Sequence, residues 1–259
     1  MMLDKNPLRA ALANGKTVYG AITGFASLDI VEMLGYGGCD FVIIDSEHGA
    51  LGIETIHAMV AAARASGTTP IVRVGGPDPR QILQALDVGA FGIHVPTVST
   101  RREAELAIQA ARYYPLGRRG LHASIRAAQY GTIPPGDYMR WTNEEPLMLL
   151  AVENVEGVNN LSEILSVPGL DVLFIGPADL SHSLGIPFQF DHPRFIGTMT
   201  EIIERARAAG VIVGTNVSTP EQAARWLEQG VQLLTFVVNG VINRSLRAML
   251  QSIQSAGKV

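Results

Sequence analysis

Several kinds of residue and segment are scarce in this chain of 259 residues, and each scarcity excludes a class of protein. The single cysteine, Cys39, excludes an intrachain disulfide and a zinc site built from several cysteines. Twenty basic residues stand against 24 acidic ones, so the chain lacks the positive excess that favours nucleic-acid binding. Apolar segments such as residues 147–152 are far shorter than the roughly 20 residues that span a bilayer.

The composition and the first residues indicate where such a chain works. Residues 1–7 contain no continuous apolar segment of the kind found in signal peptides, and the lone cysteine suits a reducing compartment. Hydrophobic residues make up 47% of the chain and charged residues 17%, which excludes a disordered chain. We therefore expect a cytoplasmic protein that binds neither nucleic acid nor a membrane.

Short apolar segments recur along the chain, each bounded by Gly, Pro, Asp or Asn, and they are rich in Val, Ile and Phe. Because they are too short for helices and apolar on both faces, they predict parallel strands covered by helices. The predicted strands are residues 18–23, 41–45, 71–74, 92–95, 147–152, 172–175, 211–214 and 233–237.

Helical patterns lie between most of these strands. Thr100 can cap a helix over residues 101–111, with Glu103 completing a capping box, and Thr219-Pro220 opens another helix. Eight β-then-α units in about 250 residues predict an α/β fold, a (β/α)8 TIM barrel forming one domain over residues 1–259. The alternative is a doubly wound open sheet, but residues 24–27 are not the glycine-rich turn that usually follows its first strand.

One connection departs from the repeating pattern. Residues 112–145, between the fourth and fifth strands, contain no clear periodicity. A connection of this length usually serves function or assembly.

Polar residues gather where the predicted strands end, which is where a barrel places its chemistry. The second strand ends in Asp45, followed by Glu47 and His48, and the third contains Arg73. His48 is a candidate base that Asp45 or Glu47 would orient, or else a cap of the next helix. Arg73 is suited to polarise a carbonyl or hold a carboxylate, or else it forms a structural salt bridge.

Two further carboxylates follow neighbouring strands. Glu153 comes after the fifth strand and Asp179 after the sixth, and such a pair suits Mg²⁺ or Mn²⁺. The alternative is a pair of solvated loop carboxylates. Backbone N–H groups in the turn 176–179 are a weak candidate site for a carboxylate. His94 lies within a strand and is interpreted as a hydrogen-bonded histidine of the core or rim.

From Asp45 onward the sequence resembles the class II 2-oxo acid aldolases typified by 4-hydroxy-2-oxoheptanedioate aldolase. The resemblance rests on ordered blocks between about residues 17 and 240. The blocks are Asp45-Ser46-Glu47-His48-Gly49, residues 70–74, 86–90, 114–120 and 152–154, and Phe174-Ile175-Gly176-Pro177-Ala178-Asp179-Leu180-Ser181.

The resemblance implies a (β/α)8 barrel, a divalent metal (Mg²⁺, Mn²⁺ or Co²⁺) and a pyruvate enolate intermediate. It assigns Glu153 and Asp179 to the metal, His48 to the base with help from Asp45 and Asp87, and Arg73 to the keto oxygen. It assigns the backbone N–H groups of Ala178 and Asp179 to the pyruvate carboxylate. It also implies a homohexamer whose C-terminal helix packs on a neighbouring subunit.

Three positions depart from the family pattern and bear on the acceptor aldehyde. Ala151 stands where a glutamine is common, Asn154 where a threonine is common, and residues 22–25 where an aromatic often shapes the aldehyde pocket. The predicted activity is reversible aldol cleavage of a 4-hydroxy-2-oxo acid to pyruvate, or a close analogue, and an aldehyde. The alternatives are another enolate reaction, such as oxaloacetate decarboxylation or cleavage of an acyl thioester, and a non-catalytic barrel.

Lysine scarcity tests the competing aldolase mechanism independently of the resemblance. A class I aldolase needs a lysine on a barrel strand to form a Schiff base. The only lysines are Lys5, Lys16 and Lys258, and none lies within a predicted strand. The loops after the seventh and eighth strands also show no clear phosphate cradle, so a phosphorylated substrate is not expected.

Overall fold

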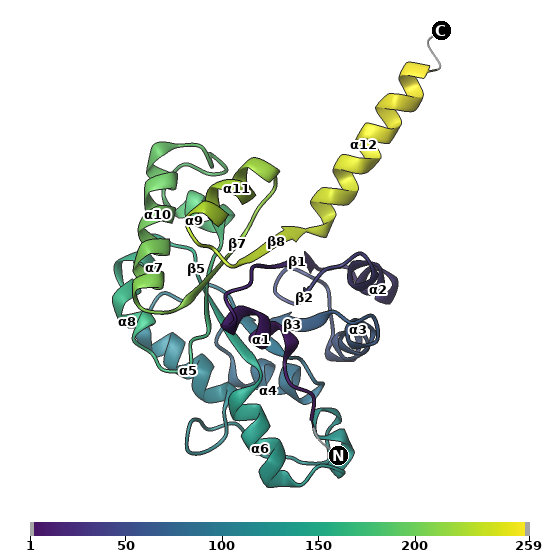
Figure 1. Ribbon diagram of the computed structural model, residues 1–259, viewed down its shortest axis with the longest axis vertical. Coiled ribbons are helices and arrows are strands. Elements are labelled where there is room, and N and C mark those ends of the chain that lie inside the picture. Colours follow the sequence, from purple (N-terminus) through teal and green to yellow (C-terminus); the bar gives the residue numbers. More distant parts are fainter. Residues whose placement is uncertain (1–2, 257–259) are drawn as a thin grey trace.

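Eight parallel strands close into a barrel in the computed structural model, which describes residues 3–256 (Figure 1). Each strand pairs with the next one along the chain, and the last pairs with the first. Lys258 and the other residues at positions 1–2 and 257–259 lie outside the described residues. The strands are β1 (Val18–Thr23), β2 (Phe41–Asp45), β3 (Thr69–Arg73), β4 (Gly92–Val95), β5 (Leu147–Val152), β6 (Val172–Ile175), β7 (Ile212–Asn216) and β8 (Leu233–Val237).

The predicted (β/α)8 barrel is therefore confirmed, and two strands differ from their predicted bounds. β3 begins at Thr69 rather than residue 71, because Thr69 and Pro70 continue the ladder opposite the first residues of β2. Pro70 is tolerated because its carbonyl accepts from the N–H of Phe91 at 2.8 Å, although it has no N–H to donate. β7 extends to Asn216, which the β8 pairing covers.

Helices cover the outside of the barrel. They are α1 (Pro7–Ala13), α2 (Leu28–Tyr36), α3 (Ile53–Ala65), α4 (Pro79–Asp87), α5 (Arg101–Ala111), α6 (Pro135–Glu144), α7 (Val155–Asn159), α8 (Leu161–Leu165), α9 (Pro177–Ser183), α10 (Pro193–Ala208), α11 (Pro220–Glu228) and α12 (Val238–Ala256), with a 3₁₀ helix at Arg126–Gly131. No described helix is long and apolar enough to cross a membrane.

The predicted helix starts at Thr100 and Thr219 are both present. Thr100 accepts from the N–H of Glu103, and the Glu103 side chain accepts from the N–H of Thr100, which completes the capping box. In the connection 112–145, by contrast, helix α6 was not predicted. It buries only Tyr138 and Thr142, against a small cluster around Tyr113, so its apolar period is too weak to read from sequence.

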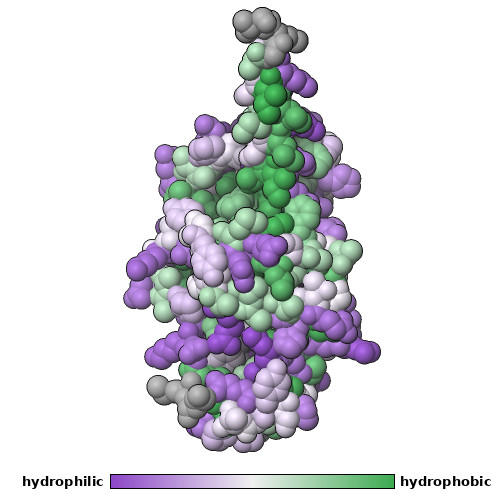
Figure 2. Space-filling view, turned by 90° about the vertical axis from the view of Figure 1, so that its right-hand side faces the viewer, coloured by the Kyte–Doolittle hydropathy of each residue, from purple (hydrophilic) through white to green (hydrophobic). Residues whose placement is uncertain are grey.

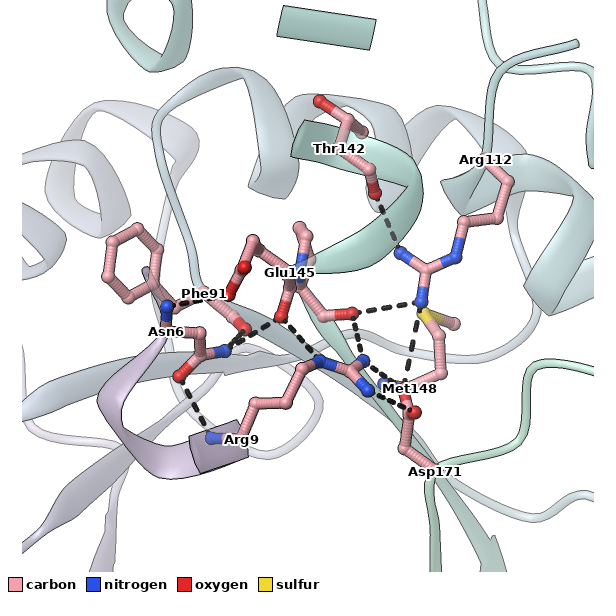
Figure 3. A network of polar contacts seen from close by, with 9 residues as sticks. Asn6, Arg9, Phe91, Arg112, Thr142, Glu145, Met148 and Asp171 are labelled. Atoms are coloured by element: carbon pink, nitrogen blue, oxygen red, sulfur yellow. Dashed lines mark hydrogen bonds and ion pairs between the residues drawn. The ribbon is translucent and has the colours of Figure 1, made fainter. Parts of the chain in front are cut away.

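The end of the barrel where the strands begin is closed by α1 and a network of polar contacts (Figure 3). Arg9 donates two hydrogen bonds to Asp171, both at 2.7 Å, and the buried Arg112 donates to the carbonyls of Thr142 and Pro146. These contacts hold the turns that precede β5 and β6. An active site is therefore expected at the opposite end of the barrel, where the strands end.

Side chains that point inward form one apolar cluster, separate from the cluster between strands and helices. The inward cluster comprises Leu8, Leu12, Val18, Ile22, Phe41, Ile43, Ile71, Leu147, Leu149, Ala151, Val172, Phe174 and Leu233. Within β2, β3, β5, β6 and β8 neighbouring residues belong alternately to the two clusters, as strand geometry requires. The inward positions at the carboxyl ends of the strands carry polar residues instead.

Candidate active site

A cavity of about 440 Å³ opens at the carboxyl ends of the strands. It gathers five side chains predicted from sequence, contributed by β2, β3, the loops that follow β2 and β5, and the first turn of α9. These side chains are those of Asp45, His48, Arg73, Glu153 and Asp179. Residues more than 130 positions apart in the sequence are therefore neighbours in one site.

Arg73 ends β3 and pairs with Asp45, its register partner on β2. Its Nε donates to Asp45 Oδ1 at 2.9 Å and its Nη2 to Oδ2 at 2.6 Å, while Nη1 lies 3.2 Å from Glu47 Oε2. Burial alone would raise the pKa of Asp45, but the hydrogen bonds and charge of Arg73 outweigh it and hold that pKa below its usual value. Asp45 is thus a fixed carboxylate that orients the guanidinium.

His48 lies on the loop after β2, with its side chain 68% exposed at the mouth of the cavity. Its Nε2 is 3.6 Å from Glu47 Oε2, whereas Asp45 accepts from the backbone N–H groups of Glu47 and His48. Of the two predicted orienting carboxylates, Glu47 therefore faces the imidazole and Asp45 shapes the loop. Gly49 allows this tight turn, because a Cβ there would lie 2.2 Å from the carbonyl oxygen of Asp45.

Glu153, directly after β5, is a buried carboxylate with one oxygen held and the other turned toward β6. Its Oε1 accepts from the N–H of Thr97 at 2.7 Å and from the Thr97 hydroxyl at 3.1 Å. Its Oε2 is the atom that a Cβ at Gly176 would approach to 2.1 Å. Burial raises the pKa of Glu153, and the negative charges of Asp179 and Glu47 raise it further.

Sequence reasoning missed Thr97, which follows β4. Its φ of 54° is a conformation that β-branched residues rarely adopt. That backbone conformation accompanies the two hydrogen bonds to Glu153, and strained residues of this kind gather at functional sites. The only sequence signal was its place at a strand end, after Val95-Pro96.

Asp179 and Ala178 lie in the first turn of α9, after β6. Within α9 the first backbone bond is from the N–H of Leu180 to the carbonyl of Gly176, at 3.0 Å. The N–H groups of Ala178 and Asp179 precede it and take no part in the helix ladder. They line the same cavity as Arg73 and Glu153, which is the place where the sequence predicted a carboxylate to bind.

The residues present fit a divalent cation bound by few protein ligands. The described residues contain no group of three or more His, Cys, Asp and Glu side chains able to hold a metal. Glu153 and Asp179, however, are two carboxylates that line one cavity, and the pKa of Glu153 is raised first by burial and then by the negative charges of Asp179 and Glu47. Mg²⁺ and Mn²⁺ commonly use one or two carboxylates and take their other ligands from water or substrate.

Asp87 is the one predicted site residue that a single chain does not bring to the cavity. It ends α4, at the opposite end of the barrel, and accepts from the buried Arg119 at 2.6 Å. Arg119 also lies 5.0 Å from the ring centroid of Tyr113. In one chain, then, Asp87 neutralises a buried arginine, and its predicted help to His48 stays a prediction.

His94 is buried in the core, as the sequence predicted. The predicted hydrogen bond of His94 is not present among the described residues. In the part of the chain that the structure describes, neither ring nitrogen has a hydrogen-bond partner. Its ring centroid lies 4.6 Å from that of Phe174, the register partner of Ala151. Burial lowers the pKa of His94 to about 3, and the charge of Arg73 also disfavours protonation.

A second recess of about 250 Å³ adjoins the cavity and was not predicted. It shares four lining residues with the cavity, which are Pro177, Ala178, Asn216 and Val237. Its walls come from the loop between α9 and α10, from α10 and from α11. This segment gave no sequence signal beyond Phe188 and Phe190 in the loop and Phe195 in α10.

Comparison with known proteins relates this site to one family. Residues 23–243 match the HpcH/HpaI aldolase/citrate lyase family. The chain is 34% identical over 253 residues to a 5-keto-4-deoxy-D-glucarate aldolase of Salmonella paratyphi C (strain RKS4594), covering 98% of this chain and 97% of the relative.

Two solved structures show the same architecture over nearly the whole chain. A family protein from Burkholderia cenocepacia J2315 superposes with a TM-score of 0.90 at 30% identity, covering 96% of this chain and 99% of the other. The citrate synthase SbnG superposes with a TM-score of 0.88 at 36% identity, covering 97% and 99%. The names of these relatives include both an aldolase and a synthase.

Proposed function

Because the chain belongs to the HpcH/HpaI aldolase/citrate lyase family, and is therefore a carbon–carbon lyase, we propose that it cleaves a 4-hydroxy-2-oxo acid. The products of this reversible aldol reaction are pyruvate, or a close analogue, and an aldehyde. The observation that carries the proposal is the convergence of Arg73, His48 and two carboxylates in one cavity. The name of the curated relatives makes 5-keto-4-deoxy-D-glucarate the first substrate to test.

Arg73 meets the charge that develops during cleavage. Breaking the C3–C4 bond sends its electron pair toward the C2 keto oxygen, which becomes an enolate oxygen. The guanidinium carries five N–H donors, and two of them bind Asp45, so others remain to donate to that oxygen. Because its side chain is only 16% exposed, the interaction acts in a partly dry site.

His48 moves the proton that cleavage releases. As the C3–C4 bond breaks, the 4-hydroxyl becomes the carbonyl of the aldehyde and gives its proton to the imidazole, directly or through water. The Glu47 carboxylate lies 3.6 Å from Nε2 and can hold the imidazole in place for this transfer. A second proton transfer, to C3 of the enolate, completes pyruvate.

The substrate is oriented at its other end by α9 and Glu153. The N–H groups of Ala178 and Asp179 are placed to receive the 2-oxo acid's carboxylate. A divalent cation bound by Glu153 and Asp179 would supply Lewis-acid polarisation of the 2-oxo acid. Thr97 fixes one oxygen of Glu153, so the other oxygen keeps a defined direction.

A Schiff-base mechanism lacks its nucleophile in the described chain. Lys5 and Lys16 are both exposed and precede β1, at the end of the barrel opposite the cavity. Neither lines the cavity between the strand ends. The proposed activity is therefore the metal-dependent, class II reaction.

Removal of metal tests the proposal. Aldol cleavage should vanish in the presence of a chelator and return with Mg²⁺, Mn²⁺ or Co²⁺, measured as release of pyruvate. Glu153→Gln should lose metal binding in calorimetry while keeping its circular dichroism spectrum, because the residue lies on the rim rather than in the core. Full activity in thoroughly metal-stripped enzyme would refute the class II mechanism.

Two other reactions on the same site remain alternatives, oxaloacetate decarboxylation and lysis of an acyl thioester. Each forms a similar enolate but needs no aldehyde. Parallel turnover of 4-hydroxy-2-oxo acids, oxaloacetate and acyl thioesters separates them from the aldol reaction. The alternative of a non-catalytic barrel would be supported by the absence of both metal binding and turnover.

A further inference from the structure

The second recess lies where a group attached to the reacting carbons could reach. It joins the catalytic cavity along Ala178 and Asn216, and Ala178 is one of the residues proposed to hold the substrate carboxylate. A molecule anchored at Ala178 can therefore extend along this shared wall into the recess. At about 250 Å³ the recess is large enough for a phenyl ring or a chain of several carbons.

Aromatic side chains form the walls of the recess. Phe188, Phe190 and Phe195 follow one another around it, with ring centroids 6.1 Å and 5.4 Å apart, and Trp226 from α11 completes the wall. Phe195 and Trp226 are buried in the core and fix the floor. Walls of this kind favour an apolar ligand, because aromatic surface gains free energy when it leaves water.

Phe188 is held in an unusual position at the mouth. It is 72% exposed and has a φ of 59°, a conformation that bulky residues rarely adopt. Its N–H donates to the Ser181 hydroxyl at 3.0 Å, and that buried hydroxyl donates to the carbonyl of Ala178 at 2.7 Å. The aromatic wall is thus tied to the turn that lines the catalytic cavity.

Two polar side chains of the recess, Arg225 and Gln222, have hydrogen-bond partners within the chain. Arg225 donates to Asp191 at 3.0 Å, and its guanidinium carbon lies 5.9 Å from the ring centroid of Trp226. Gln222 accepts from the N–H of Ser218 at 2.8 Å. An apolar ligand in the recess leaves both interactions in place.

From the continuity, the aromatic walls and the engaged polar groups, we infer that the recess is the subsite for the acceptor aldehyde. It selects an aldehyde with an apolar body, aromatic or aliphatic, over a hydroxylated or anionic one. This inference rests on the proposed aldol function and adds the class of its second substrate. The substrate inferred for this chain therefore differs from 5-keto-4-deoxy-D-glucarate, which the name of the curated relatives gives.

A series of aldehydes tests the inference. Condensation with pyruvate and Mn²⁺ should be measured for acetaldehyde, butanal, hexanal and benzaldehyde, with D-glyceraldehyde and succinic semialdehyde as hydroxylated and anionic members. We expect kcat/KM to rise roughly two- to fourfold with each added methylene, since each is buried. Glyceraldehyde and succinic semialdehyde should fall below butanal.

Two variants probe the wall by opposite means. Phe188→Ala removes an exposed ring and should lower kcat/KM for benzaldehyde at least tenfold, with less than a threefold change for acetaldehyde, which does not reach the wall. Ser218→Phe fills the mouth and should exclude benzaldehyde and hexanal while acetaldehyde still reacts. Tyr130→Ala is the matched control, because Tyr130 is also an exposed aromatic residue at positive φ but lies outside both cavities.

Exchange of pyruvate methyl protons with deuterated solvent keeps the two proposals distinguishable, because it needs the enolate but no aldehyde. Exchange together with the apolar preference and its loss in the variants supports the inference. Exchange with preference for glyceraldehyde or succinic semialdehyde, or equal losses for all aldehydes in Phe188→Ala, overturns the inference and leaves the proposed function standing. Absence of both exchange and condensation refutes the proposed function and the inference with it.

Discussion

At the scale of single residues, Arg73 shows how one side chain can be both structural and reactive. Its two hydrogen bonds to Asp45 form the structural salt bridge that the sequence offered as the alternative role of Arg73. The same guanidinium lines the cavity and keeps further donors. The two interpretations are therefore compatible, and kinetics must separate them.

Arg73→Ala should reduce turnover more than substrate affinity, because donation to the keto oxygen strengthens as that oxygen becomes an enolate. The variant should also slow exchange of pyruvate methyl protons with deuterated solvent, measured by NMR. Arg73→Lys should restore little activity, since a flexible point charge does not reproduce the planar fork that binds Asp45. If Arg73→Ala exchanged pyruvate protons at the wild-type rate and failed only in the reaction with aldehyde, Arg73 would act on the aldehyde and not on the keto oxygen.

The burial of His94 predicts how the free energy of unfolding depends on pH. Burial lowers its pKa from 6.5 to about 3, so between these values the unfolded chain binds a proton that the folded chain does not. The free energy of unfolding should therefore fall as the pH falls through this window. Relative to His94→Leu, the wild-type protein should lose about 2 kcal/mol between pH 6.5 and pH 4.5.

Denaturant titrations followed by circular dichroism at the two pH values measure this difference. His57→Leu is the control, because His57 lies on the outer helix α3, away from the barrel interior. A difference between the wild type and His94→Leu that does not change with pH would mean that the folded barrel protonates His94.

The residue types at the site could be predicted from sequence, but their partners could not. Asp45 and Arg73 end their strands, and Glu153 and Asp179 follow theirs. A barrel brings the ends of its strands together. Thr97 was missed because its role depends on a left-handed backbone conformation rather than on its chemical type. Whether Asp45 or Glu47 faces His48 is likewise set by the loop's path, which Gly49 permits.

At the scale of elements, the junction between β6 and α9 places four residues of the cavity wall, Gly176, Pro177, Ala178 and Asp179. Gly176 separates the strand from the helix, and its missing side chain leaves room for the Glu153 carboxylate from β5. Ala178 and Asp179, in the first turn of α9, line the same cavity. A close approach between two strands thus sets the position of the predicted metal ligand.

Gly176→Ala should displace the Glu153 carboxylate, because the new Cβ would lie 2.1 Å from its Oε2. The clash involves the end of a flexible side chain, so the barrel should keep its circular dichroism spectrum while metal affinity falls at least tenfold in calorimetry. Gly197→Ala serves as control, since a Cβ there meets nothing within 4 Å. Unchanged metal affinity in Gly176→Ala would remove Glu153 Oε2 from the metal site.

Strands and capped helices could be predicted because their signals are local. The capping box of Thr100 and Glu103 fixes the start of α5 from four residues. Helix α6 and the recess walls depend instead on contacts between distant segments, such as Phe195 of α10 beside Trp226 of α11. Such contacts leave no period in the sequence.

At the scale of the whole molecule, α12 departs from the compact barrel. It projects away from the other helices, and apolar side chains run along its length (Figures 1 and 2). Leu246, Met249, Leu250 and Ile253 are each more than half exposed, and they fall on one face of the helix. A single chain thus leaves this apolar face uncovered.

An apolar face of this size favours a partner, and we expect the helix to pack on a second copy of the chain, as the predicted homohexamer requires. Burial of each leucine would contribute about 1.5–3 kcal/mol to that contact. Light scattering should therefore show an oligomer at micromolar concentration.

Leu246→Glu combined with Leu250→Glu should yield smaller species whose barrels remain folded by circular dichroism. Gln251→Glu adds a negative charge off the apolar face and should leave the assembly intact. If the unmodified protein is a monomer at this concentration, α12 has another partner and the homohexamer is refuted.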